Sequence, residues 1–215
     1  MTQSADSACP ATSAQAQDGR AARSIWLFRH GALVPNPERR FVGQRDVELS
    51  AHGRASFEAL AARFAEVHAD NPPQAFFCSD SSRGIACADM LRRAFRPRGG
   101  TMPVIADRGF REISLGAWEG LTKEEVERRF PGALAERDRN WADYAPAGGE
   151  SFAMLSSRAL MALVRARMHC PEGMLVVVGH ASFNRCVLAD YLALPLCEAR
   201  RIPQEYGCMA CLENR

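Results

Sequence analysis

The chain has 215 residues, of which 47% are hydrophobic and 24% charged, with 27 Lys and Arg side chains against 25 Asp and Glu. This length and composition indicate a globular protein with one domain of ordinary size. The near balance of charge gives no support for a nucleic acid or an anionic membrane as a partner, and no apolar run is long enough to span a membrane.

The N-terminal segment, residues 1–23, contains no Val, Ile, Leu or Phe. It is too polar for the core of a signal peptide and too poor in large apolar side chains to fold. We therefore expect a disordered polar tail over 1–23, a single domain over 24–215 and a cytoplasmic location. The spacing of the eight cysteines suits free thiols in a reducing compartment, and the single Cys-x-x-Cys pair, Cys208 and Cys211, is too little for a zinc site.

The first predicted element is a buried strand over residues 24–28, which ends in Arg29-His30-Gly31. Ligands of open α/β sheets bind at the carboxyl ends of the strands, so these side chains stand where a ligand would bind. Arg offers a bidentate fork to phosphoryl oxygens, a neutral His can attack as a nucleophile, and Gly31 permits close approach of a substrate. Taken alone, His30 could equally be a structural hydrogen-bonding residue.

Residues 32–47 form a loop rich in Pro, Gly and charge, which suits either a substrate rim or a merely solvated loop. Ser50 is a predicted N-cap, and apolar residues recur behind it at helical spacing. The helix is expected to end near residue 69, because Asn71-Pro72-Pro73 cannot continue it.

A second strand is predicted over 74–78, and the cluster from Ser79 to Arg83 begins a helix that runs to about residue 95. Arg83 then lies in the first turn, where a cation opposes the helix dipole. A bound phosphate would remove this conflict, because the free helix N–H groups and the guanidinium both favour an anion. The pattern therefore indicates an anion site at Arg83.

The remaining elements continue the alternation of strands and helices. Their predicted bounds are a strand over 102–106, an irregular segment over 110–120, a helix from a Thr122–Glu125 capping box to Pro131, a surface excursion over 133–149, a helix over 151–169, a strand over 174–179, a helix over 183–192 and a strand over 207–212. The strand over 174–179 leads to His180, so two strands each end in a His. This order predicts a mostly parallel sheet with helices on both faces.

Five motifs in order make the chain resemble the histidine phosphatase superfamily, which includes the cofactor-dependent phosphoglycerate mutases. They are Arg29-His30-Gly31 with Asn36, Gly43-Gln44, Asp46, Leu49-Ser50 and Gly53; Ser79-Asp80-x-x-Arg83; Arg111-Glu112-Ile113-x-x-Gly116-x-Trp118-Glu119-Gly120; Gly148-Gly149-Glu150-Ser151; and Gly179-His180. The resemblance spans about residues 24–212 and implies a three-layer α/β/α sandwich with a mostly parallel central sheet.

The resemblance also implies a phosphohistidine mechanism. His30 would match the nucleophile, while Arg29, Arg83 and His180 would match the basic residues that hold the phosphoryl oxygens. Glu112 would match the general acid that protonates the leaving oxygen. The implied substrate site consists of Arg29, Gly31, Asn36, Gln44, Arg83, His180 and Ala181, with no metal and no cofactor. Fixed cations suit a phosphoryl group in transfer, and an alkoxide leaves poorly without a proton donor.

Three positions need separate comment. Glu119 is a competing carboxylate, although it matches a capping or surface charge better than a general acid. Leu33 stands where many members of the superfamily have Thr or Ser, so one hydroxyl contact to phosphate is missing. Ala181 follows the second His where Gly is common, and little effect is expected if its φ is negative.

The chain lacks the extra insertion of the mutases, which favours a metal-independent phosphomonoester hydrolase acting on a small phosphorylated metabolite. The Phe-x-Gly-Gln-x-Asp motif and the segment 203–208 most resemble proteins like α-ribazole phosphatase, so α-ribazole phosphate is a candidate substrate. Two alternatives stay open, a mutase-type phosphotransferase and a catalytically silent phosphate-binding regulator. Homodimers are common in such folds, but no residue of this sequence indicates that the chain forms one.

Overall fold

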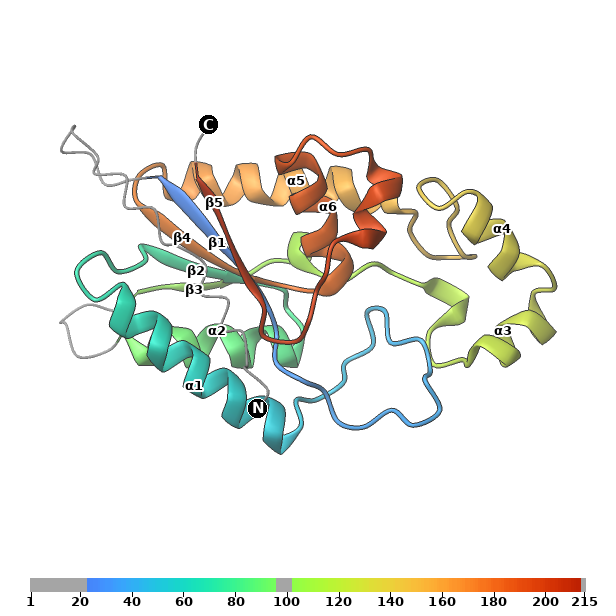
Figure 1. Cartoon of the computed structure of the whole chain (residues 1–215), viewed down its shortest axis with the longest axis horizontal. Coiled ribbons are helices and arrows are strands. Elements are labelled where there is room, and N and C mark those ends of the chain that lie inside the picture. Colours follow the sequence, from blue (N-terminus) through green and yellow to red (C-terminus); the bar gives the residue numbers. More distant parts are fainter. Residues whose placement is uncertain (1–22, 96–101, 214–215) are drawn as a thin grey trace, which may run out of the picture.

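The computed structural model describes residues 23–95 and 102–213, and a five-stranded sheet lies at its centre (Figure 1). The strands are β1 (Ser24–Arg29), β2 (Ala75–Cys78), β3 (Val104–Ala106), β4 (Met174–Gly179) and β5 (Met209–Glu213). Their order is β3-β2-β4-β1-β5, in which β1 to β4 pair in parallel and β5 pairs antiparallel with β1. The predicted mostly parallel sheet is confirmed.

β4 lies in the middle of the sheet and is buried along its whole length. Its residues are all small or apolar, as expected for a parallel strand covered by helices on both faces. β1 pairs with β4 in register, so that Arg29 lies opposite Gly179. The next residue of each strand, His30 and His180, therefore leaves the sheet at the same carboxyl edge.

Helices cover both faces of the sheet (Figure 1). They are α1 (Ala51–Val67) and α2 (Ser82–Ala94) on one face, and α5 (Phe152–His169) and α6 (Ala181–Tyr191) on the other. Successive strand side chains alternate between the faces. Phe28 packs into the core cluster of α1 and α2, whereas its neighbour Leu27 packs into the cluster of α5 and α6. The predicted three-layer α/β/α sandwich is confirmed.

The segment between β3 and α5 extends away from the sheet at one end of the molecule (Figure 1). It carries the 3₁₀ helices η2 (Arg108–Phe110) and η3 (Gly116–Trp118) and the helices α3 (Lys123–Arg129) and α4 (Ala133–Arg139). The predicted capping box of Thr122 and Glu125 begins α3. α4 lies in the predicted surface excursion over 133–149, where no helix was expected, because it has neither a buried residue nor a side-chain N-cap to mark it.

The other predicted bounds agree to within a few residues. Ser50 caps α1, as predicted, by accepting a hydrogen bond from the Gly53 N–H. α6 begins at Ala181, two residues before the predicted start. A further 3₁₀ helix, η4 (Leu196–Arg201), precedes β5. The predicted tail over 1–23 lies outside the described residues, apart from Arg23.

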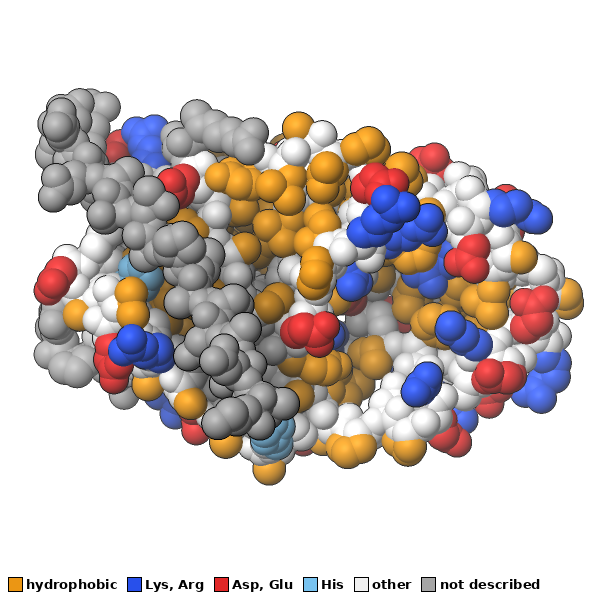
Figure 2. Space-filling view, in the orientation of Figure 1, with side chains coloured by type: hydrophobic (Ala, Val, Ile, Leu, Met, Phe, Trp, Pro, Cys, Tyr) orange, Lys and Arg blue, Asp and Glu red, His pale blue; other side chains and the backbone are white. Residues whose placement is uncertain are grey.

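On the face seen in Figure 2, Lys and Arg side chains are interspersed with Asp and Glu, in keeping with the near balance of charge in the sequence. In the described parts of the chain, every helix is too short or too polar to cross a membrane. The seven cysteines within those parts are free thiols.

Candidate active site

His30 follows β1 and is 4% exposed. Its Nδ1 lies 2.8 Å from the Gly31 carbonyl oxygen. A carbonyl oxygen can only accept, so Nδ1 carries the proton and Nε2 of the neutral ring keeps a free electron pair. A Cβ on Gly31 would lie 2.5 Å from the Gly53 carbonyl oxygen in α1. Packing against α1 is thus a further reason for glycine after the His.

His180 follows β4 and lies edge-on to His30, with the ring centroids 5.0 Å apart. It is 1% exposed, and its Nε2 lies 2.8 Å from Ser79 Oγ. Its Nδ1 is buried and finds no hydrogen-bond partner within residues 23–95 and 102–213. Because an unpartnered polar atom is costly to bury, this nitrogen suggests a ligand that completes the site.

Arg83 and Arg29 bring guanidinium groups to the same edge of the sheet. Arg83 is 2% exposed in the first turn of α2, as predicted, and donates to the Arg45 carbonyl oxygen at 2.7 Å. Arg29 donates to the Gln204 carbonyl oxygen, and its Cζ lies 3.9 Å from the centroid of the Tyr206 ring. The Nε of each arginine is buried without a partner in the described part of the chain. Each arginine therefore retains an unused donor.

The two candidate carboxylates have different surroundings. The Glu112 oxygens accept from the backbone N–H groups of Ile113, at 2.8 Å, and of Ser182 in the first turn of α6, at 3.1 and 3.2 Å. Glu119 accepts from the backbone N–H groups of Gln44, at 2.8 Å, and Leu115, at 3.0 Å, and so ties two loops together. Glu112 faces the cavity described next, whereas Glu119 has the structural contacts expected of a capping charge.

A cavity of about 110 Å³ lies at this edge of the sheet. It is lined by Gln44, Asp46, Asp80, Ser81, Arg83, Arg111, Glu112 and His180. Arg111 adds a further guanidinium, with its Nη2 donating to Asp80 at 2.7 Å. Guanidinium groups, an imidazole and the N-termini of two helices favour a small, multiply charged anion such as phosphate.

Both imidazoles are neutral at pH 7. Burial lowers the pKa of His30 to about 3; the hydrogen bond to Gly31 opposes this shift, while the charges of Arg83 and Arg29 add to it. Burial, with His30 and Arg83 beside it, likewise holds the pKa of His180 well below its usual 6.5. A neutral His30 keeps the electron pair that a nucleophile needs.

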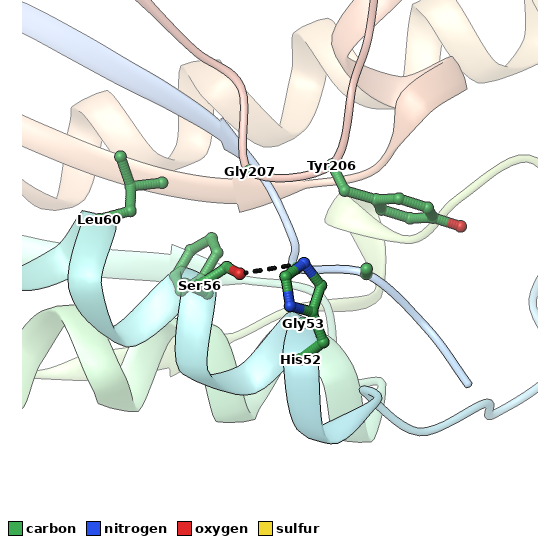
Figure 3. Close-up of a pocket in the computed structure, with 9 residues that line it drawn as sticks. His52, Gly53, Ser56, Leu60, Tyr206 and Gly207 are labelled. Carbon is green, nitrogen blue, oxygen red and sulfur yellow. Dashed lines mark hydrogen bonds between the residues drawn. The ribbon is translucent and has the colours of Figure 1, made fainter. Parts of the chain in front are cut away.

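A larger hollow, of about 310 Å³, lies between the start of α1 and the segment at Tyr206 and Gly207 (Figure 3). His52 and Ser56 line it, and the Tyr206 side chain extends away from both. None of the described residues around this hollow carries a guanidinium or a carboxylate. The smaller cavity is therefore the better site for a phosphoryl group. His30 and Arg29 do not line this cavity, and His30 lies next to it through its ring contact with His180.

The remaining predicted substrate residues occupy different places, and Gly31 lines the 310 Å³ hollow rather than the inner cavity. Gln44 lines the 110 Å³ cavity, and its Nε2 donates to the Glu112 carbonyl oxygen at 3.0 Å. Ala181 is the first residue of α6, and its φ is not positive. Asn36 lies in an exposed loop, where its side chain bonds the backbone of Arg40, and it lines an outer hollow of about 350 Å³ rather than the inner cavity.

Sequence reasoning missed the residue that holds the Glu112 segment in place. Arg158 of α5 donates to the carbonyl oxygens of Gly109, Arg111 and Glu112 at 2.9, 3.0 and 3.2 Å. Its guanidinium also makes a two-point ion pair with Glu150, at 2.8 Å for each contact. Glu150 belongs to one of the sequence motifs. Arg158 itself could not be predicted, because its other contacts are to backbone carbonyl groups, which every residue has.

Arg158→Ala is expected to lower both stability and activity. The change removes charged hydrogen bonds from a mostly buried group, which lowers the free energy of unfolding by about 2 kcal/mol. It also releases the segment that carries Glu112, which lowers kcat/KM by on the order of 100-fold. Urea unfolding and steady-state kinetics measure the two effects. Arg165→Ala, on the same helix and in an exposed ion pair with Asp107, is the control and should change little.

A profile of the histidine phosphatase superfamily, branch 1, matches residues 25–215. The chain belongs to this superfamily. A glucosyl-3-phosphoglycerate phosphatase from Mycolicibacterium vanbaalenii is 40% identical over 139 residues, 64% of this chain and 57% of that protein, so the match spans less than two thirds of the relative's length. The Mycobacterium tuberculosis protein of the same name is 36% identical over 184 residues, 81% of this chain and 78% of that one.

Solved structures of the superfamily share the fold. YhfR from Bacillus stearothermophilus superposes with a TM-score of 0.75 at 30% identity, covering 88% of this chain and 90% of that one. The α-ribazole phosphatase from Shigella flexneri gives a TM-score of 0.74 at 20% identity, covering 87% and 89%. At that identity the likeness concerns the fold alone. The superfamily match and the relatives named as phosphatases support phosphatase activity on small phosphorylated metabolites, as the sequence motifs predicted.

Proposed function

We propose that the protein is a metal-independent phosphomonoester hydrolase that works through a phosphohistidine at His30. The observation that carries this proposal is the state of that side chain. His30 is buried and neutral, and its Nδ1 is fixed on Gly31, which leaves Nε2 as the nucleophilic nitrogen. Arginine side chains at the same edge of the sheet supply the positive charge that phosphoryl transfer requires.

The reaction follows in two steps. His30 Nε2 attacks phosphorus as the bond from phosphorus to the ester oxygen breaks, and Glu112 gives its proton to the leaving oxygen. In the second step Glu112 takes a proton from water, the water oxygen attacks phosphorus, and the bond from phosphorus to Nε2 breaks to release inorganic phosphate. Arg29, Arg83 and His180 hold the phosphoryl oxygens during both steps.

For the natural substrate we favour an acidic sugar phosphate, such as glucosyl-3-phosphoglycerate, over α-ribazole phosphate. The relatives at 40% and 36% identity are named for the first compound, whereas the α-ribazole phosphatase offers only a shared fold. The outer hollow of about 350 Å³ adjoins the inner cavity, because Arg45 lines the former and its neighbours Gln44 and Asp46 line the latter. This hollow is suited to the alcohol part of the substrate.

Arg45→Ala is expected to raise KM for an acidic substrate about tenfold, because it removes one charge-assisted contact to the carboxylate. The Arg45 side chain is exposed, whereas the nearby Arg40 is held in ion pairs with Glu38 and Glu125. With p-nitrophenyl phosphate, which has no carboxylate, KM should stay within about twofold, since surface substitutions away from bound groups have small effects. An equal change in KM for the two substrates would remove Arg45 from the substrate site.

The proposal is tested by measuring free phosphate released in EDTA. The substrates would be glucosyl-3-phosphoglycerate, α-ribazole phosphate, 3-phosphoglycerate, nucleoside monophosphates and p-nitrophenyl phosphate. Release that survives the chelator and is fastest with glucosyl-3-phosphoglycerate supports the proposal. Isomerisation of 3-phosphoglycerate without release would support the mutase alternative. Binding of phosphate without turnover of any compound would support a silent binding protein.

A further inference from the structure

Two serine hydroxyls connect His180 to the N-terminus of α2. Ser79 Oγ lies 2.8 Å from His180 Nε2 and 2.8 Å from Ser81 Oγ. Ser81 is the N-cap of α2, and its Oγ accepts from the Gly84 backbone N–H at 3.2 Å. Ser79 is fully buried, and a Cβ on Gly84 would come within 2.5 Å of its Oγ, so the packing fixes the position of this hydroxyl.

The N-cap and the dipole of α2 favour one direction for this chain of hydrogen bonds. Gly84 can only donate through its N–H, so Ser81 Oγ accepts from it and keeps a second lone pair and its own proton. Between Ser81 and Ser79 either hydroxyl can be the donor. When Ser81 donates to Ser79, Ser79 donates in turn to His180 Nε2. The positive end of the helix dipole favours the same order, because each hydroxyl turns its oxygen toward the helix.

We propose that Ser79 is a positioning residue that, together with Ser81, holds His180 in the neutral tautomer with its proton on Nδ1. In this tautomer the nitrogen without a protein partner is a donor, and it meets a phosphoryl oxygen with an N–H. In the opposite tautomer the Nδ1 lone pair would face the oxygen, which repels it. Ser79 thus acts on the reaction through His180 and does not itself touch the phosphoryl group.

The tautomer matters because His180 is neutral. Its surroundings are cationic, and burial adds to their effect in keeping its pKa well below the usual value. The charged and titratable groups around it are Arg29 at the end of β1, His30 after β1, Arg83 in α2, Arg158 in α5, and Glu112 in the segment before η3. A neutral imidazole has a single N–H. The hydroxyl bound to one ring nitrogen therefore decides whether the other nitrogen is a hydrogen-bond donor or an acceptor.

The direct test is ¹⁵N NMR of the imidazole nitrogens in the phosphate-free protein at pH 7.5. The signals of His180 are assigned by their loss in His180→Gln. We expect a protonated Nδ1 and an unprotonated Nε2 in the wild type. A wild-type protein with the proton on Nε2 overturns the proposal. This measurement needs no turnover, so its outcome is independent of the proposed function.

The kinetic test rests on the proposed function and uses Ser79→Ala. At pH 8 its kcat should fall on the order of 10- to 100-fold, the cost of losing one aimed donor. In Ser79→Ala the ¹⁵N signals of His180 should show that the proton is no longer confined to Nδ1, because the ring stays neutral and has a single N–H to place. A Ser79→Ala protein in which kcat falls while the His180 proton stays on Nδ1 would mean that Ser79 only fills space, and would contradict the proposal.

Ser50→Ala is the matched control. Ser50 caps α1 through the Gly53 N–H as Ser81 caps α2, but no imidazole is attached to it. Its loss should reduce stability by the usual cost of an N-cap and leave the His180 tautomer and kcat unchanged. Ser81→Ala should weaken the preference for the Nδ1 proton while the contact between Ser79 and His180 remains.

Discussion

His30→Ala is expected to reduce kcat/KM by at least about 10⁴-fold, because the covalent route through the imidazole disappears and only the electrostatic stabilisation by the cations remains. The fold should survive, since the side chain lies at the end of β1 rather than inside either core cluster. The measurement is an acid-labile, alkali-stable phosphoenzyme, trapped by rapid quenching with labelled substrate. The wild type should carry the label and His30→Ala should not.

His52→Ala provides the matched control, because His52 is an exposed histidine on α1 whose ring contacts Ser56. This variant should keep both the label and the wild-type rate. Label on the His30→Ala protein, or wild-type turnover without the side chain, would show that another group is the nucleophile. The remaining candidate would then be His180.

The low pKa of His30 gives the same variant a second signature. In the unfolded chain a histidine titrates near 6.5, whereas in the folded protein the pKa is lowered to about 3. Between these values the unfolded state binds a proton that the folded state does not, so stability falls as the pH drops from about 6.5 toward 3. His30→Ala should lose stability less steeply across this window. The nucleophile itself stays neutral at pH 5, so its protonation should not reduce kcat/KM there.

The parts of the site that could be predicted from the sequence are those with a local signal. His30 and His180 follow apolar runs that could only be buried strands, and parallel strands place their carboxyl ends at one edge. Arg83 stood out because a cation in the first turn of a helix contradicts the local electrostatics. In each case the neighbours in sequence contain the information that fixes the position.

The missed features depend on neighbours that are distant in sequence. Arg158 contacts backbone carbonyl groups nearly 50 residues away. Every residue has a backbone carbonyl group, so the sequence does not show which of them Arg158 binds. Tyr206 lies in the segment 203–208, whose sequence gives no sign that the Tyr206 ring covers the Arg29 guanidinium. The antiparallel direction of β5 was also unpredicted, because strand direction at a sheet edge is set by the path of the preceding loop. For α4, the lack of a buried face removed the periodic signal on which prediction depends.

Arg83→Met is expected to lower kcat/KM by about 10³-fold, the scale of losing an arginine that stabilises a transferring phosphoryl group. The same change should leave the melting temperature equal to or above that of the wild type. Burial lowers the pKa of Arg83, which reflects the cost of keeping this cation out of water. The charge also lies at the positive end of α2, near Arg29 and two imidazoles. Replacing a buried charge by an apolar side chain of similar length is often neutral or stabilising.

Inorganic phosphate should separate the two effects of this arginine. Phosphate at 100 times its Kd stabilises the wild-type protein by about 2.7 kcal/mol through mass action, and Arg83→Met should lose most of this shift. Arg93→Met, at the opposite end of the same helix and exposed, removes a cation that the dipole favours and should lower stability slightly with full activity. A clear loss of stability in Arg83→Met, with an undiminished phosphate shift, would mean that the hydrogen bonds of Arg83 to the loop at Gly43 and Arg45 are its main role. The opposite pattern would identify Arg83 as a residue kept for the anion at the expense of the fold, which is what its place in the first turn of α2 implies.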